Sequence, residues 1–315
     1  MLNEYPDSKL FIEALVKDNP DVSQDFLHSQ AFLKSYSRKS EATYRSYRNE
    51  VERLLLWSWT VANKSIIQLK RPELEAFFDF IHSPPIEWVG ESVQDRFKSI
   101  GGEWLQNEFW RPVVAKISTE DRKKATAGGL DVKPDTKGHT LSGEAIKICF
   151  SAISCFYDYL ADEGYAFGNP IPAIRKQSPY LIKGATQKNI KRLSNLQWDY
   201  VLSCAEAKAN ADTNYERMLF VVALIKTLYL RVSELSDRSN WQPIWQHLWQ
   251  DSDGNHWLKV LGKGNKIRDI SVPSALFPYI KRYKAFRTEQ NSNFNSNAPL
   301  VIKNRGTGGM SSRQL

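Results

Sequence analysis

The stretch MLFVVALIKTLYLRVSELS, residues 218–236, decides the fold of the C-terminal half of the chain. Its first part, 218–230, is apolar on most faces, which predicts a buried central helix. Arg231 follows directly, and Glu234 lies three residues later, within side-chain reach. The pair has two explanations. It is a structural salt bridge, or it is a guanidinium orientated by a carboxylate so that it can bind an anion through two hydrogen bonds.

The pattern after Trp241 changes from the period of a helix to that of short strands. Strands are predicted within 245–250, 256–262 and 267–273, with DSDGN (251–255) and KGNK (263–266) as the turns between them. Pro273 then opens another helix. These segments predict a small antiparallel sheet.

Basic residues gather in the second of these turns. Lys263 lies between Gly262 and Gly264, and Lys266 and Arg268 follow. Glycines allow a tight turn whose backbone can approach a ligand, and a lysine there is a mobile charge or proton donor. A nucleotide-binding P-loop is excluded, because G-x-x-x-x-G-K-[ST] is absent and the glycines join two strands.

The N-terminal half has helical patterns throughout. Residues 1–39 form a polar helical extension, and apolar stripes predict helices at 40–59, 71–82 and 141–165. Residues 84–140 are less regular and form an insertion within a helical domain at 40–169. The tryptophans of the insertion either belong to a core, which is the favoured interpretation, or form a protein contact: Trp88, Trp104 and Trp110.

A basic segment separates this helical domain from the C-terminal one at 193–315. Residues 170–192 contain no acidic residue, which predicts a basic linker between domains, or otherwise a solvated loop. Its cations are Arg175, Lys176, Lys183, Lys188, Lys191 and Arg192.

Composition limits the class of protein. A chain of 315 residues and 36.2 kDa accommodates two domains. Its net charge of +8 favours a polyanionic partner, either nucleic acid or an anionic membrane surface. No signal peptide and no apolar block long enough for a membrane span is present in the sequence. Three cysteines without metal-ligand spacing fit a reducing cytoplasm, and Cys149 is predicted to be a buried thiol: Cys149, Cys155 and Cys204.

Together, LRVSEL (230–235) and GKGNKIRDISVP (262–273) resemble the tyrosine recombinase, or phage integrase, family. TYRSYRNEVERLLLW (43–57) and AISCFYDYLADEGY (152–165) resemble the helical core-binding domain of that family, so the resemblance covers residues 40–315. It implies a mainly α fold with a small antiparallel β-sheet. A helical core-binding (SAM-like) domain would precede a partial α/β integrase catalytic domain.

The resemblance implies a site-specific DNA recombinase or integrase, which cleaves and rejoins strands through a phosphotyrosine without a metal or another cofactor. Arg231 would stabilise the phosphate, Glu234 would hold Arg231, and Lys263 would be the general acid. Double-stranded DNA would lie between the two domains, and the full-length protein would act as a homo-oligomer on paired sites. Lys266 and Arg268 would contact backbone phosphates or stay solvated, and further DNA contacts are expected at Arg175, Lys176, Lys188, Lys191 and Arg192.

The chain departs from the family pattern in two ways. Tyr229 replaces the glycine that usually stands two residues before the arginine. The later H-x-x-R box, its following His or Trp, and the nucleophilic tyrosine would lie beyond Leu315, because Tyr279 and Tyr283 come too early. The chain is therefore expected to stop inside the catalytic domain. Two alternatives stay open: a non-catalytic DNA-binding relative that occupies sites or regulates a recombinase, and an RNA- or protein-binding helical module with coincidental motifs.

Overall fold

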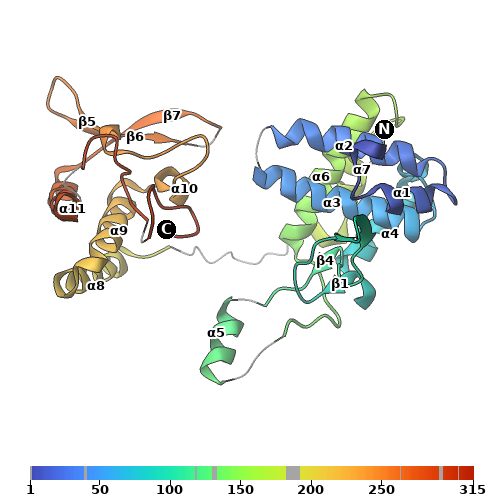
Figure 1. Cartoon of the computed structure of the whole chain (residues 1–315), viewed down its shortest axis with the longest axis horizontal. Coiled ribbons are helices and arrows are strands. Elements are labelled where there is room, and N and C mark those ends of the chain that lie inside the picture. The colour runs from blue at the N-terminus through green and yellow to red at the C-terminus, as the bar shows by residue number, and fades with distance from the viewer. Residues whose placement is uncertain are drawn as a thin grey trace. The chain divides into compact units, whose positions relative to one another are not determined.

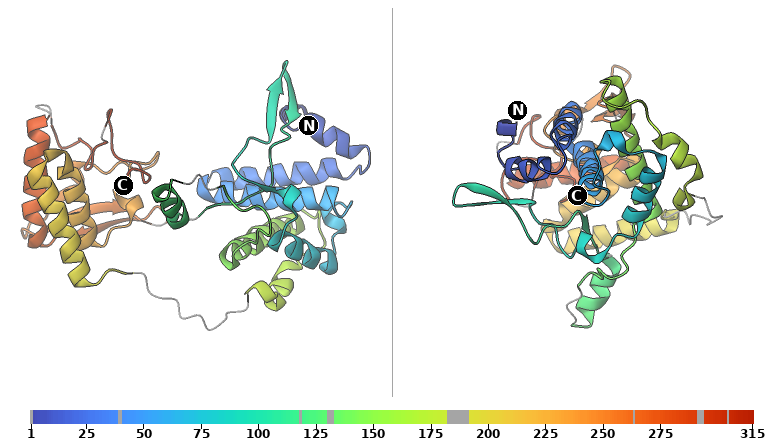
Figure 2. Two further views of the ribbon diagram at one scale, coloured as in Figure 1. Left: turned by 90° about the horizontal axis from the view of Figure 1, so that it is seen from below. Right: turned by 90° about the vertical axis from the view of Figure 1, so that its right-hand side faces the viewer.

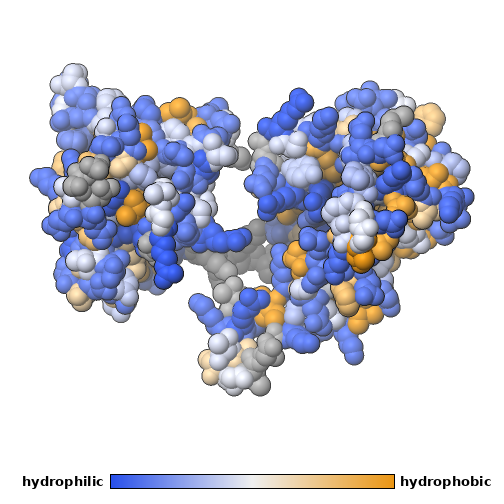
Figure 3. Space-filling model, viewed as in Figure 1, coloured by the Kyte–Doolittle hydropathy of each residue, from blue (hydrophilic) through white to orange (hydrophobic). Residues whose placement is uncertain are grey.

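The structure is a computed structural model that describes residues 2–38, 41–117, 119–129, 133–181, 192–262, 264–290, 294–303 and 305–315. It divides into two compact units, which we call the first unit (Met1–Thr186) and the second unit (Gln187–Leu315) (Figure 1). Each unit is described by itself below. The face shown in Figure 3 is mostly hydrophilic, with hydrophobic residues scattered among polar ones.

The first unit is a bundle of helices, and the helices expected at 40–59, 71–82 and 141–165 are present. The longest, α3 and α6, pack against each other and against α2. Ser142 caps α6 by accepting a hydrogen bond from the Ala145 N–H at 3.3 Å. The helices are α1 (Lys9–Val16), α2 (Val22–Ser37), α3 (Glu41–Thr60), α4 (Arg71–His82), α6 (Gly143–Asp162) and α7 (Ile171–Gln177).

The core of the first unit is aromatic and includes the N-terminal helices. Phe78 of α4 stacks on Phe150 of α6, with ring centroids 3.7 Å apart. Phe32 of α2 is 1% exposed and packs against Phe156 of α6. Residues 1–39 were expected as a polar extension, but α2 is part of this core because its apolar face covers α3 and α6.

The insertion at 84–140 contains two small sheets and a helix. β1 (Val89–Gly90) pairs in parallel with β4 (Val113–Val114). β2 (Phe97–Ile100) and β3 (Glu103–Gln106) form a hairpin that stands out from the helices (Figure 2), and α5 covers Thr119–Ala127.

The interpretation of the insertion's tryptophans as core residues is wrong for Trp104 and holds only in part for Trp88, which is half-buried and packs against the core of the first unit. Trp104 lies on the projecting hairpin and is 38% exposed. Trp88 and Trp110 are only half-buried; Trp88 packs edge-on against Phe80, and Trp110 lies under the guanidinium of Arg96. The insertion therefore lies at the margin of the core, where its tryptophans stay partly exposed.

The segment 170–192 is only partly a linker. Its first residues form α7, whose Ile171 and Ile174 are buried in the core of the first unit. Arg175 and Lys176 are exposed on that helix. Arg192 is exposed just before α8, whereas Lys183, Lys188 and Lys191 lie outside the described residues.

The second unit is a three-stranded antiparallel sheet with helices around it, and the three predicted strands are present. Trp245–His247, expected within the first strand, form a 3-10 turn instead. The strands are β5 (Leu248–Gln250), β6 (His256–Leu261) and β7 (Ile267–Ser271), in the order β5-β6-β7. The helices are α8 (Asn195–Ala211), α9 (Glu216–Leu228), α10 (Val232–Leu235) and α11 (Phe277–Gln290). The chain as a whole is mainly α with a small antiparallel sheet, as predicted.

Helix α9 lies at the centre of the second unit, as its apolar sequence predicts. Leu224 is fully buried, and Phe220 stacks on Tyr283 of α11 with ring centroids 4.4 Å apart. Pro273 precedes a short 3-10 turn, Ser274–Leu276, that runs directly into α11. No helix in the described ranges is both long and apolar enough to cross a membrane.

Candidate functional site

The site begins where the chain turns sharply between α9 and α10. Tyr229 ends α9 in a left-handed conformation, with φ 52° and ψ 39°, and its N–H donates to the Ile225 carbonyl at 3.0 Å. Glycine is the residue that adopts this conformation without steric cost. The turn places Arg231 directly before the first residue of α10.

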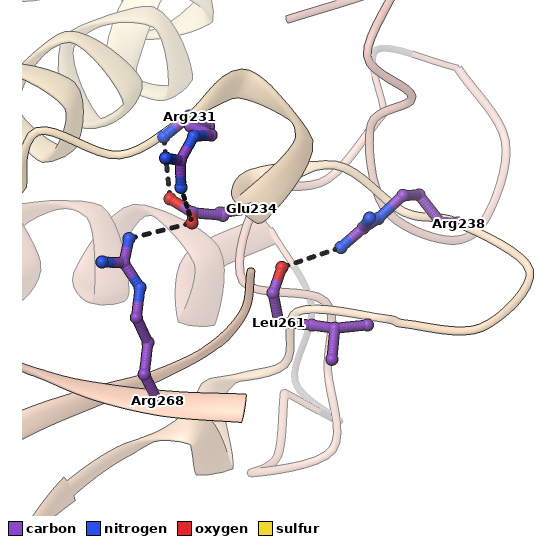
Figure 4. Close-up of polar contacts among 5 residues, drawn as sticks. All are labelled: Arg231, Glu234, Arg238, Leu261 and Arg268. Carbon is purple, nitrogen blue, oxygen red and sulfur yellow. Dashed lines mark hydrogen bonds and ion pairs between the residues drawn. The ribbon is translucent and has the colours of Figure 1, made fainter. Parts of the chain in front are cut away.

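Glu234 is the buried centre of the site. Its side chain is 0% exposed, and both of its oxygens accept hydrogen bonds (Figure 4). Oε2 accepts from the backbone N–H of Arg231 at 2.8 Å, and Oε1 accepts from the Nη1 of Arg231 at 3.1 Å. Oε1 also accepts from the Nη2 of Arg268 at 2.9 Å.

Arg268 reaches Glu234 because of the register of the sheet. On β7, Arg268 pairs with Val260 of β6, and Val260 is 1% exposed. Paired residues in an antiparallel ladder point to the same face, so the stem of Arg268 leaves the sheet on its buried side. Sequence reasoning missed this contact. The alternation of 267–271 indicates on which face of the strand Arg268 lies. It does not identify Glu234 of α10 as the partner of Arg268.

The two guanidinium groups are held but remain accessible. The side chain of Arg231 is 63% exposed and that of Arg268 is 49% exposed, whereas the carboxylate between them is buried. Two cations on one anion leave a local excess of one positive charge. A planar guanidinium whose orientation is fixed on one edge can offer its other N–H groups to a phosphate oxygen.

The turn between β6 and β7 begins beside this carboxylate. The Gly262 N–H donates to the Lys266 carbonyl at 2.8 Å, and Gly264 and Asn265 both have positive φ, 74° and 58°. A methyl group added to Gly262 would lie 3.6 Å from the Oε1 of Glu234. The hairpin thus starts beside Glu234 and Arg268.

The predicted site residues fall into three groups. The structure brings Arg231, Glu234 and Arg268 together. Lys266 and Arg192 are exposed in the same unit, and no contact joins them to the cluster in the described part of the chain. The remaining residues are Arg175 and Lys176 on the first unit, and Lys188, Lys191 and Lys263, which lie outside the described residues.

The positive charge of the chain is concentrated in the second unit. That unit contains 19 lysines and arginines against 10 acidic residues, a net charge of +9. The first unit contains 24 against 25, a net charge of −1. The arginine cluster therefore lies in the unit that accounts for all of the basic excess, where a polyanion is attracted most strongly.

The two tyrosines nearest to the sheet in sequence are not free to react. Tyr283 is 0% exposed. The hydroxyl of Tyr279 donates to Glu206 at 2.6 Å, and partial burial together with this carboxylate raises the pKa of Tyr279 to about 12. Neither is an activated nucleophile as it lies in the structure.

Surface hollows are present away from the arginine cluster. One of about 470 Å³ in the first unit is lined by residues such as Phe11, Arg48 and Arg96. Another, of about 490 Å³, lies between the sheet and α11 and is lined by Trp249, Trp257 and Ile280 among others. The two arginines of the cluster are instead exposed at the surface of the second unit.

No protein-family model and no curated protein matches the chain. A similar solved structure is the crystal structure of the XerH site-specific recombinase bound to difH substrate, a pre-cleavage complex. The match has 13% sequence identity and a TM-score of 0.39, and covers 91% of this chain and 74% of that chain. A likeness of this size does not establish the family.

Proposed function

We propose that this chain acts on double-stranded DNA in site-specific recombination, in which strands are cleaved and rejoined through a phosphotyrosine. The observation that carries the proposal is the arrangement of Arg231 and Arg268, two accessible guanidinium groups held on the buried carboxylate of Glu234. The ordered motifs around these residues resemble the tyrosine recombinases, which supports the same function. In such an enzyme, a homo-oligomer would assemble on paired DNA sites.

The arginines would act on the charge of the reacting phosphate. Attack on a phosphodiester concentrates negative charge on the non-bridging oxygens, and fixed cations stabilise that charge without reorganising. Glu234 would keep both guanidinium groups in place. The leaving 5′ oxygen needs a proton, and the resemblance assigns Lys263 to that role.

A second function is a non-catalytic DNA-binding protein that occupies sites or regulates a recombinase. The placement of Tyr279 and Tyr283 favours it, because neither can attack a phosphate as it lies. For either function, we expect residues 1–315 to bind a duplex without forming a covalent adduct on a nicked substrate. An adduct that disappears with Tyr279→Phe, or with Tyr229→Phe at the exposed tyrosine near Arg231, would overturn this expectation.

The DNA-binding part of the proposal is tested by measuring affinity as a function of salt. Fluorescence anisotropy with a labelled duplex should show an affinity loss of orders of magnitude between about 50 and 200 mM salt, if roughly six or more phosphates are contacted. A flat salt response would remove DNA as the partner.

The role of Arg231 is tested with a matched variant. The salt slope is the magnitude of the slope of log K against log salt concentration. We expect Arg231→Ala to lower the salt slope by about one while the far-ultraviolet circular dichroism spectrum stays unchanged. Arg305→Ala removes the same charge from an exposed position of the same unit and is the control. Loss of folding in Arg231→Ala would instead support a purely structural salt bridge.

The two candidate functions differ in their effect on an activated phosphate. In a 5′-bridging phosphorothiolate, the leaving group is a thiolate, which departs without receiving a proton. The arginines alone should therefore accelerate the cleavage of this linkage by water. With a pool of duplexes that each carry one such linkage, a recombinase site predicts slow cleavage that depends on Arg231 and Glu234. DNA binding without any such cleavage would favour the non-catalytic function.

A further inference from the structure

The tip of the β6–β7 hairpin is not held by apolar packing. Residues 264–269 are all exposed, and Ile267, the only large apolar side chain among them, is 58% exposed. Two of the turn residues, Gly264 and Asn265, have left-handed backbones. A two-stranded projection of this kind is only marginally stable by itself, so its position depends on polar contacts to its surroundings.

Two such contacts come from one loop, residues 237–241, which follows α10. The Nη2 of Arg238 donates to the carbonyl of Leu261, the last residue of β6, at 3.1 Å (Figure 4). The Nδ2 of Asn240 donates to the Oδ1 of Asn265 in the turn at 3.0 Å. One contact therefore holds the base of the turn, and the other holds its tip.

The loop itself is fixed within the second unit. Its backbone closes on itself, because the Arg238 N–H donates to the Trp241 carbonyl at 2.8 Å and the ring of Trp241 stacks on His247. On its other side, the Asp237 N–H donates to the Met310 carbonyl at 2.7 Å, and Asp237 Oδ2 accepts from the Gly309 N–H at 3.1 Å. The loop is thus an anchored element, while the turn it contacts is exposed.

We propose that Arg238 and Asn240 are positioning residues that hold the β6–β7 hairpin against the arginine cluster. The anchored loop holds the turn through its two hydrogen bonds, and Arg268 holds the second strand of the hairpin through its ion pair with Glu234. The proposed function enters this inference at one point only: the hairpin, once held, would present Lys266 and Arg268 to a phosphate. The positioning itself is a property of the free protein.

Hydrogen exchange of the full chain without DNA tests the positioning directly. We expect Asn240→Ala and Arg238→Gln each to speed exchange of the Gly262 amide by about five- to tenfold, because the turn bond to Lys266 opens more often. Ser239→Ala, at an exposed position of the same loop, is the matched control and should change nothing. Unchanged exchange at Gly262 in both variants would overturn the proposal.

DNA binding distinguishes a positioning residue from one that contacts phosphate. Both variants should lower duplex affinity while leaving the salt slope unchanged, since the number of phosphate contacts stays the same. A slope that falls by about one in Arg238→Gln would make Arg238 a direct phosphate contact and contradict its positioning role. If the wild-type chain shows no salt-dependent binding, the proposed function fails, while the exchange measurement still decides the positioning.

Discussion

At Tyr229, a bulky residue occupies a backbone conformation that suits glycine. Its φ of 52° costs an L-residue about 1–2 kcal/mol, because its Cβ crowds the following carbonyl oxygen. The side chain is 83% exposed, so packing returns little of that cost. The turn is kept nonetheless because it sets Arg231 at the start of α10, where Glu234 can bind both its backbone and its guanidinium.

The first prediction concerns this strain. Tyr229→Gly should raise the free energy of unfolding by up to about 1 kcal/mol, since relief of the left-handed strain outweighs the extra entropy of glycine in the unfolded chain. Urea denaturation measures the change.

Asn63→Gly is the matched control for this prediction. Asn63 also has positive φ, 50°, and asparagine tolerates this conformation, so its replacement should gain less. A lower stability of Tyr229→Gly would show that the exposed ring makes contacts that outweigh the strain.

Among the helices of the first unit, one buried carboxylate joins four separate segments. Asp25 of α2 is 0% exposed; its Oδ2 accepts from the Trp59 Nε1 at 2.9 Å and the Ile66 N–H at 3.1 Å. Its Oδ1 accepts from the hydroxyls of Ser65 at 2.7 Å and Tyr165 at 2.8 Å. Burial raises the pKa of Asp25 despite these bonds. A hydroxyl can also accept, so a proton on Oδ1 is tolerated.

The second prediction is a dependence of stability on pH that Asp25→Asn removes. The pKa of Asp25 is raised on folding, so its contribution is fully present below the unfolded value of about 3.9 and is lost as pH rises through the folded value. In the variant, the asparagine side chain would turn its amide nitrogen toward the two hydroxyls and carry no charge. Denaturation at a series of pH values should therefore show a flatter profile for the variant as the pH rises above about 4.

Two further variants sharpen this test. Asp18→Asn removes an exposed carboxylate just after α1 and should leave the pH profile unchanged. Asp25→Ala leaves the Trp59 and Ile66 donors without an acceptor and should cost roughly 2–5 kcal/mol at any pH. A profile that is the same in wild type and Asp25→Asn would show that Asp25 does not titrate in this range.

The elements of this chain were predictable wherever a period repeats over several residues. The apolar stripes of α3, α4 and α6, the apolar run of α9 and the strand patterns of β6 and β7 each indicate their element from the sequence alone. The contacts that join elements were not predictable. Arg268 meets Glu234 across 34 residues, and Tyr165 meets Asp25 across 140, through a register and a packing that no local pattern encodes.

The site was predictable in part for the same reason. Arg231 and Glu234 lie three residues apart, so their contact follows from local geometry. Arg238 gave no such signal, because its acceptor is a backbone carbonyl in a distant strand. The tryptophans of the insertion were misjudged because ring size predicts a preference for burial, not the presence of a core around the ring.

At the scale of the whole molecule, the two units differ sharply in charge. With a net charge of +9 against −1, the second unit should supply most of the phosphate contacts of a complex with DNA. DNA contacts are predicted at Arg175 and Lys176 on α7 and at Lys266 on the hairpin. The contribution of each to DNA binding can be measured separately.

The third prediction is a difference between the units in their salt slopes. Lys266→Gln should lower the slope of log K against log salt by about 0.9, because one phosphate contact is lost in the basic unit. Arg175→Gln and Lys176→Gln together should lower it by less than that. A fall of about two in the double variant would instead place α7 on the DNA.

The uneven charge has a consequence for how a complex would begin. A duplex attracts the second unit over a range of about 8 Å at physiological salt, and it attracts the first hardly at all. This attraction would orientate the chain before contact. The second unit, which carries the arginine cluster, would therefore bind the duplex first, and the first unit would bind afterwards. Productive collisions would be a larger share of all collisions than for a uniformly charged chain, and that advantage would vanish as added salt shortens the range of attraction.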